Sequence, residues 1–207
     1  MERVFNTAKV FASRMDADER TMAAATLVQR LAAKNDELAD HALDTGSLAA
    51  RLAQSMGLSY DDVVETSLIG TLHEVGAIVV PAAVLDGLEF AAPSEVLRVQ
   101  RAERRAAVAL VRSVPAIADL ADAVGSLFDD VVPTLTARIV VVADQYDYLV
   151  RDFEICPGIS GHEALAVLKR HAGVRYDRHV VAALGSMLRL VHLRELMEEL
   201  GAACCRA

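Results

Sequence analysis

The chain has 207 residues, which suits one domain with short extensions. Its residues are 54% hydrophobic but only 4% aromatic, with no Trp, a composition that favours closely packed helices over a β-sandwich. The formal charge of −8 opposes binding to nucleic-acid phosphates unless basic residues cluster.

Cysteine usage and hydropathy indicate a protein of the reducing cytoplasm. The three cysteines, Cys156, Cys204 and Cys205, form no CxxC pair and no disulfide framework. The N-terminus lacks the apolar segment of a signal peptide. No apolar run reaches the roughly 18–20 residues of a membrane span. We therefore expect a cytoplasmic location and no membrane association.

Helical periodicity covers most of the chain and is interrupted by short breaks. Ser59 is a predicted N-cap, and Ser160 with Glu163 forms a predicted capping box. The β-branched run 139–142 suggests a strand in isolation, but the spacing of the apolar residues around it predicts a buried helix. The expected elements are residues 1–35 with a break near Asp16–Asp18, 37–56, 59–76, a short turn at 81–85, 93–112, 115–127, 133–150, 160–173 and 178–200 ending at Gly201. The sequence therefore predicts an all-α fold of about eight helices.

One predicted helix carries the densest basic stretch, with Arg98, Arg101, Arg104 and Arg105 around Glu103. A basic helix face can bind nucleic acid, but it is also common as a solvated surface. We interpret this stretch as a solvated face and predict no nucleic-acid partner.

Three places in apolar helical stretches carry side chains suited to chemistry: His41, the pair His73–Glu74, and Asp144. Imidazole nitrogens and carboxylate oxygens together suit Fe, Mn or Zn, and such an ion can activate water. The alternative is that each is a hydrogen-bonded core or boundary residue, because a buried polar group needs a partner.

The order of these residues resembles that of HD-GYP domains, bacterial metal-dependent phosphodiesterases of the HD phosphohydrolase superfamily. LVQRLAAKNDELADHALDTGSLAARLAQSMGLS (27–59) is similar to the opening of the domain, where His41 takes the place of a metal-binding His. In LIGTLHEVGAIVVPAAVL (68–85), His73 matches the His of the family's His-Asp pair and Glu74 replaces the Asp. TARIVVVADQYDYLV (136–150) is similar to the segment whose Asp binds metal, here Asp144.

The resemblance also covers residues 161–184 and implies three segments: an N-terminal helical extension (1–26), an HD-GYP-like domain (27–186) and a C-terminal helix end and tail (187–207). It implies a partial metal site at His41, His73, Glu74 and Asp144.

Several parts of the family pattern are missing. Ala77 replaces a catalytic Lys. The position at which the family has a further His falls near Ala102, and the segment 124–137 has no His and no Gly-Tyr-Pro loop. Asp129 and Asp130 in that segment are interpreted as a solvated loop, although they could bind a cation. The other histidines are interpreted as surface or boundary residues: His162, His171, His179 and His192.

Three functions follow as alternatives. The loss of ligands favours a non-catalytic regulatory or protein-interaction module of cyclic-di-GMP-type signalling, without a cofactor. Its partner would be another protein or a second copy, bound through N-terminal apolar positions such as Val4, Phe5 and Phe11. The retained residues favour a metal-dependent phosphohydrolase or phosphodiesterase with one Fe, Mn or Zn ion. A cyclic-dinucleotide receptor without turnover is disfavoured by the missing loop.

Overall fold

The computed structural model describes residues 2–81, 84, 91–127, 133–152 and 157–204. Within these ranges the chain forms eight α-helices, two 3₁₀ helices and no strand, which confirms the predicted all-α class. The helices are α1 (Glu2–Ala32), α2 (Asp36–Ser55), α3 (Tyr60–Leu72), α5 (Pro93–Arg112), α6 (Ala121–Ser126), α7 (Leu135–Val150), α8 (Gly161–Arg170) and α9 (Arg178–Cys204); the 3₁₀ helices are η1 (Val75–Val79) and η3 (Pro115–Leu120).

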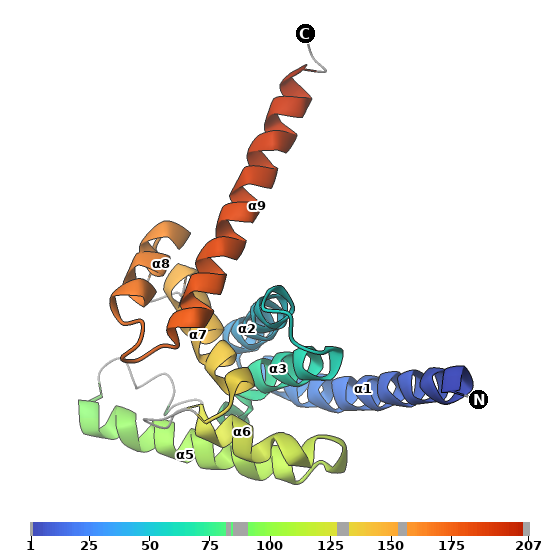
Figure 1. Ribbon diagram of the computed structural model, residues 1–207. Coiled ribbons are helices and arrows are strands. Elements are labelled where there is room, and N and C mark those ends of the chain that lie inside the picture. Colours follow the sequence, from blue (N-terminus) through green and yellow to red (C-terminus); the bar gives the residue numbers. More distant parts are fainter. Residues whose placement is uncertain (1, 82–83, 85–90, 128–132, 153–156, 205–207) are drawn as a thin grey trace.

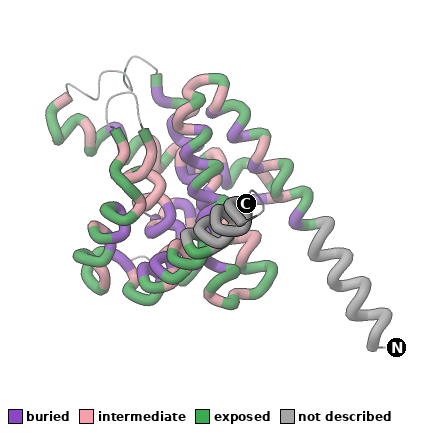
Figure 2. Tube along the Cα trace, turned by 90° about the horizontal axis from the view of Figure 1, so that it is seen from above, coloured by how far each residue is buried: buried purple, intermediate pink, exposed green. Residues whose placement is uncertain are grey.

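Helices α2, α3 and α7 pack against one another at the centre of the molecule (Figure 1). Helix α5 lies along one side of this group with η1 and α6, and α8 packs with α7 and the start of α9. The N-terminal half of α1 and the C-terminal half of α9 project from the bundle (Figure 1). The buried residues gather where the central helices meet (Figure 2), and include Leu52, Ile69, Leu72, Val111, Ile139 and Leu184.

Side-chain caps fix where the central helices begin. The Asn35 side chain accepts a hydrogen bond from the Leu38 amide at the start of α2, and Thr134 accepts one from Ala137 at the start of α7. The predicted cap Ser59 and the predicted box of Ser160 with Glu163 are both confirmed. Each cap satisfies an amide that the helix itself leaves without a partner.

Two glycines allow α2 and α3 to cross in close contact. A Cβ atom on Gly46 would lie 2.8 Å from the carbonyl oxygen of Ser67, and one on Gly70 would lie 2.9 Å from the Gly46 Cα. Both distances are shorter than a carbon atom tolerates, so larger residues would push the helices apart. The crossing matters for function because His41 lies on α2 and His73 follows α3.

Four predicted boundaries were wrong. Helix α1 continues through Asp16–Asp18, because no Gly or Pro interrupts that polar stretch. The element predicted to reach Gly76 ends as an α-helix at Leu72 and continues as η1. The segment 115–127 begins as the 3₁₀ helix η3, and α9 passes Gly201 to Cys204 because one Gly weakens a helix without necessarily ending it. The predicted turn at 81–85 lies largely outside the described residues.

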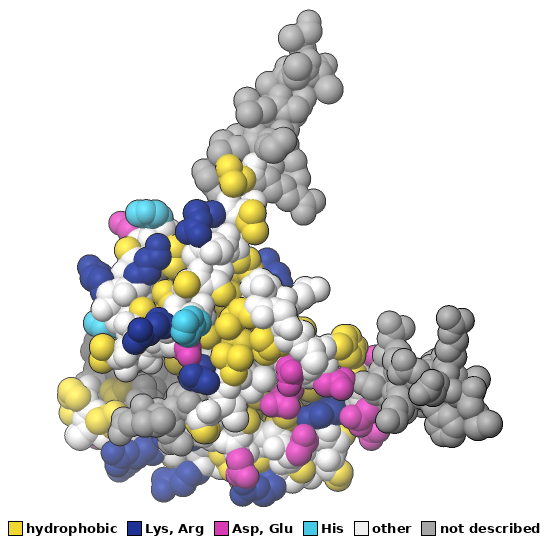
Figure 3. Space-filling model, in the orientation of Figure 1, with side chains coloured by type: hydrophobic (Ala, Val, Ile, Leu, Met, Phe, Trp, Pro, Cys, Tyr) yellow, Lys and Arg dark blue, Asp and Glu magenta, His cyan; other side chains and the backbone are white. Residues whose placement is uncertain are grey.

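On the face shown in Figure 3, many Lys and Arg side chains lie over α5 and α8, and several Asp and Glu side chains lie over α1 and α3. Arg98, Arg101 and Arg105 are exposed, as expected of a solvated helix face. Among the described residues, no helix combines the length and hydropathy needed to cross a membrane.

The glycine crossing gives a first prediction. Replacing Gly46 by Ala should lower the free energy of unfolding by about 1–3 kcal/mol, because the added methyl group meets the α3 backbone. The matched control, Ser47→Ala, changes an exposed neighbour on the same helix and should stay within about 0.5 kcal/mol. Urea unfolding followed by circular dichroism measures both, and equal stability of the two variants would contradict the close crossing.

Candidate metal site

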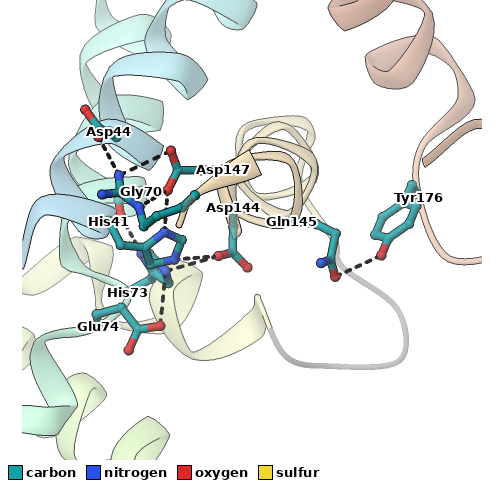
Figure 4. Close-up of polar contacts among 10 residues, drawn as sticks. His41, Asp44, Gly70, His73, Glu74, Asp144, Gln145, Asp147 and Tyr176 are labelled. Carbon is teal, nitrogen blue, oxygen red and sulfur yellow. Dashed lines mark hydrogen bonds and ion pairs between the residues drawn. The ribbon is translucent and has the colours of Figure 1, made fainter. Parts of the chain in front are cut away.

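Residues from α2, from the end of α3 and from α7 meet at one place between these helices (Figure 4). His41 lies in the second turn of α2, His73 is the C-cap of α3, and Asp144 lies in the middle of α7. Glu74 follows His73 in the break before η1. The early end of α3 therefore places both members of the His73–Glu74 pair at a helix terminus, where their side chains can face α2 and α7.

His73 is held with one ring nitrogen free of hydrogen bonds. Its Nδ1 donates to the carbonyl oxygen of Gly70 at 2.6 Å, so in the neutral ring Nε2 carries the lone pair. Nε2 is buried and makes no hydrogen bond, although it lies 3.3 Å from Glu74 Oε1 and 3.4 Å from Asp144 Oδ1. A buried nitrogen in this state is costly unless a proton or a cation is shared with the nearby carboxylates.

His41 is oriented in the same way, by a carboxylate. Its Nδ1 lies 2.6 Å from Asp147 Oδ2, while its Nε2 lies 3.0 Å from Asp144 Oδ1. Arg151 in turn donates from Nε to Asp147 at 2.8 Å and also pairs with Asp44 on α2. A carboxylate behind the imidazole fixes the tautomer that leaves Nε2 available to a metal ion.

The carboxylates change the protonation of both rings. Burial favours the neutral imidazole of His73, but Glu74 and Asp144 outweigh it and raise the pKa well above its ordinary value. Burial also opposes charge on His41, whose pKa is nevertheless raised by its contacts with Asp144 and Asp147. The pKa of Asp144 is lowered despite its burial, because both histidines contact it. Without a metal, the cluster is therefore an ion-paired group of imidazolium and carboxylate.

Another carboxylate, Glu103 on α5, lies close enough to Glu74 to be affected by its charge. Burial and the negative charge of Glu74 raise the pKa of Glu103 to about 7, against the opposing effect of the Lys34 ammonium. Near neutral pH, Glu103 therefore adds less than a full negative charge to this region.

The donor set fits a divalent metal ion. One ligand atom from each of His41, His73 and Asp144 lies within 4.8 Å of the others, and Glu74 lies beside His73. Two imidazoles and a carboxylate match the preferences of Fe, Mn and Zn. The buried Nε2 of His73 supports this fit, because it makes no hydrogen bond and faces Glu74 and Asp144, where a metal ion could take the place of a proton. The four residues predicted from the sequence are thus brought together, and the binding of an ion by them remains a prediction.

A pocket of about 260 Å³ opens beside these groups. It lies between α2, the His73–Glu74 break and α7. Its lining residues are Leu38, His41, Glu74, Asp144, Gln145 and Tyr148. None of them is Lys or Arg, and His41 is already paired with Asp144 and Asp147, so within the described lining an anion would depend on a bound cation for charge compensation.

Sequence reasoning missed Asp147, Arg151 and Gln145. Asp147 could have been found, because it lies three residues after Asp144 and shares its helix face. Ala102, where the family pattern places a further His, is exposed, and so are His162, His171 and His179. The predictions for Asp129 and Asp130 fall outside the described residues, as does the burial of His192.

The model of the HD domain family matches residues 38–149, more than half of the chain. The chain therefore belongs to the HD domain family, within the HD phosphohydrolase superfamily. The matched range contains His41, His73, Glu74 and Asp144, the set gathered at the site. No curated protein matches the sequence.

The raised pKa values of the histidines predict how metal binding depends on pH. A metal ion needs both imidazoles neutral, so it must displace protons that the carboxylates hold. Affinity for Mn²⁺ or Zn²⁺ should fall as pH decreases through the raised pKa values, by about tenfold per pH unit for each proton displaced. Calorimetric titrations between pH 6 and pH 8 measure this slope. An affinity independent of pH over that range would contradict binding through these histidines.

A third prediction concerns Asp147. Replacing it by Ala should weaken metal binding by about 10- to 100-fold, because His41 loses the acceptor that orients its ring. The control, Asp40→Ala, removes an exposed carboxylate from α2 and should leave the affinity unchanged. Comparing the dissociation constants of the two variants tests the orienting role, which equal constants would refute.

Proposed function

We propose that this HD domain is a degenerate HD-GYP-type module that binds one divalent ion and acts as a non-catalytic regulatory or protein-interaction domain in bacterial cyclic-di-GMP-type signalling. The observation that supports this is the content of the pocket. It lies beside the donors for one ion, and none of its described lining residues is Lys or Arg.

The position of Ala77 strengthens this interpretation. The resemblance implies a catalytic Lys there, but Ala77 is 1% exposed and packs with the apolar side chains of Val28 and Leu31. The nearby cation, Lys34, donates to the backbone carbonyls of Ala77, Ile78 and Val80 and is thereby engaged in holding η1. Without a cation at the pocket, a phosphodiester transition state would lose one source of charge stabilisation.

Glu74 weakens a two-ion mechanism further. In the family pattern this position is an Asp expected to bridge two ions, and Glu is longer by one methylene group. A bound ion would polarise a phosphoryl oxygen and lower the pKa of a bound water. With His41, His73 and Asp144 around a single ion, Glu74 is available to complete its coordination or to hold a proton beside it.

The projecting helices support a role in protein interaction. The N-terminal half of α1 and the C-terminal half of α9 extend beyond the bundle (Figure 1). We propose that the partner is another signalling protein or a second copy bound along the first part of α1. Light scattering during size-exclusion chromatography tests self-association.

A metal-dependent phosphohydrolase with one ion is the second candidate. It is favoured by the hydrogen bonds behind both imidazoles, from His41 to Asp147 and from His73 to Gly70, which turn Nε2 of each ring toward Asp144, a lining residue of the pocket. In this case the ion would activate water, and His41, His73 and Asp144 would hold it, with a phosphomonoester as the substrate class.

Metal content and turnover distinguish the two candidates. Protein purified without an affinity metal column should contain about one Fe, Mn or Zn per chain by inductively coupled plasma mass spectrometry. His73→Ala should lose this ion because it removes one of the three converging donors, whereas the exposed-site control His162→Ala should keep it. The loaded wild-type protein should not hydrolyse cyclic di-GMP.

Two outcomes would change this proposal. Hydrolysis of cyclic di-GMP or of a phosphomonoester with Mn, Fe, Mg or Ni, abolished in His73→Ala, would establish the enzyme instead. A folded wild-type protein that binds no divalent ion would show that the cluster is an ion-paired part of the core.

A further inference from the structure

Gln145 is the one amide side chain among the lining residues described for the pocket, which also include the titratable groups of His41, Glu74 and Asp144. It follows Asp144 directly on α7, at the edge of the candidate metal site. Tyr148, one turn later on the same helix, and Leu38 on α2 provide the apolar part of the wall. The pocket therefore combines a metal-binding end with one amide and an apolar rim.

A buried tyrosine holds this amide in one orientation. The Tyr176 hydroxyl donates to Gln145 Oε1 at 3.0 Å. Tyr176 is only 5% exposed, belongs to the main hydrophobic core, and has the Arg175 guanidinium 5.6 Å from its ring centre. Because the amide oxygen is occupied, the NH₂ group is the donor left to face the pocket. Figure 4 shows the nitrogen turned toward the side on which Asp144 lies.

An NH₂ group beside a metal site is suited to an anionic ligand. A divalent ion held by two imidazoles and a carboxylate keeps coordination positions open to the pocket. An oxyanion bound there would bring further oxygens within reach of neighbouring donors, and hydrogen bonds to a charged group are stronger than neutral ones. The volume of about 260 Å³ lies below the usual range of about 300–1,000 Å³ for drug-sized ligands, which favours a small ligand.

We propose that Gln145 donates a hydrogen bond to a small metal-bound oxyanion, a phosphate or a phosphomonoester, and that Tyr176 is the residue that positions Gln145. This inference rests on the metal site of the proposed function and names the ligand that such a regulatory domain would detect. Leu38 and Tyr148 leave an apolar surface for the group esterified to the phosphate.

The test uses the full chain loaded with Mn²⁺ and titrated with inorganic phosphate by calorimetry, with acetate as a second ligand. Wild-type protein should bind phosphate more tightly than acetate. Gln145→Leu should weaken phosphate binding by about tenfold, the usual effect of losing a hydrogen bond to a charged group, without changing the Mn²⁺ affinity. Gln145→Glu keeps an oxygen for Tyr176 but puts a carboxylate against the anion, so it should weaken binding further.

Tyr176→Phe separates positioning from a structural role. It should weaken phosphate binding several-fold in the wild-type background and add nothing in the Gln145→Leu background, because Tyr176 acts through Gln145. The Mn²⁺ affinity should stay unchanged in both variants, whereas a general disturbance of α7 would reduce it.

Each contrary result is distinct. Unchanged phosphate affinity in Gln145→Leu or Gln145→Glu overturns the role of Gln145. If the effects of Tyr176→Phe and Gln145→Leu on phosphate affinity add up in the double variant, the positioning role of Tyr176 is overturned. Phosphate binding of equal strength without Mn²⁺, or none with Mn²⁺ bound, overturns the oxyanion site and leaves the metal site intact. A chain that binds no Mn²⁺ refutes the metal site itself, and with it this inference.

Discussion

The close crossing of α2 and α3 is the constraint on which the rest of the site depends. Gly46 and Gly70 let the two backbones meet without intervening side chains. The carbonyl of Gly70, at this contact, also accepts the hydrogen bond from His73 Nδ1. The glycine contact therefore sets both the separation of α2 and α3 and the direction of the His73 imidazole. The ring centres of His41 and His73 consequently lie 5.1 Å apart.

The opposing charges of the cluster explain how a polar group can exist inside so apolar a bundle. His41 and His73 are 2% and 4% exposed, and neither would tolerate burial as an isolated charge. Asp144 and Asp147 supply compensation from α7, and Arg151 balances Asp147 from the solvent side. Such a network adds specificity for one arrangement of helices, because removing any member leaves another buried group without a partner. The same network prepares the site for a cation, since an ion can replace the protons without moving the ligands.

The proposed function depends on a site that keeps its metal donors but departs from the HD-GYP pattern it resembles. The hydrogen bonds behind the imidazoles are present, whereas Ala77 and Glu74 stand where that pattern has a Lys and an Asp. These features suit a domain that detects a ligand or holds a partner more than one that must stabilise a phosphodiester transition state. The Gln145–Tyr176 pair is consistent with detection of a ligand, because it adds to the pocket a neutral donor that the sequence resemblance did not suggest.

The sequence by itself determined the local structure and the chemical types of the site. Apolar periodicity gave the helices, and Ser59 and the Ser160–Glu163 pair marked their beginnings, because capping involves neighbours within a few residues. The order of His41, His73, Glu74 and Asp144 identified the candidate ligands through a family resemblance. Only the tertiary structure decided that these residues meet, that α3 ends before His73, and that Asp147 and Tyr176 orient their partners. Those contacts join residues 31 to 106 positions apart, and their distances depend on how whole helices pack, which no local pattern encodes.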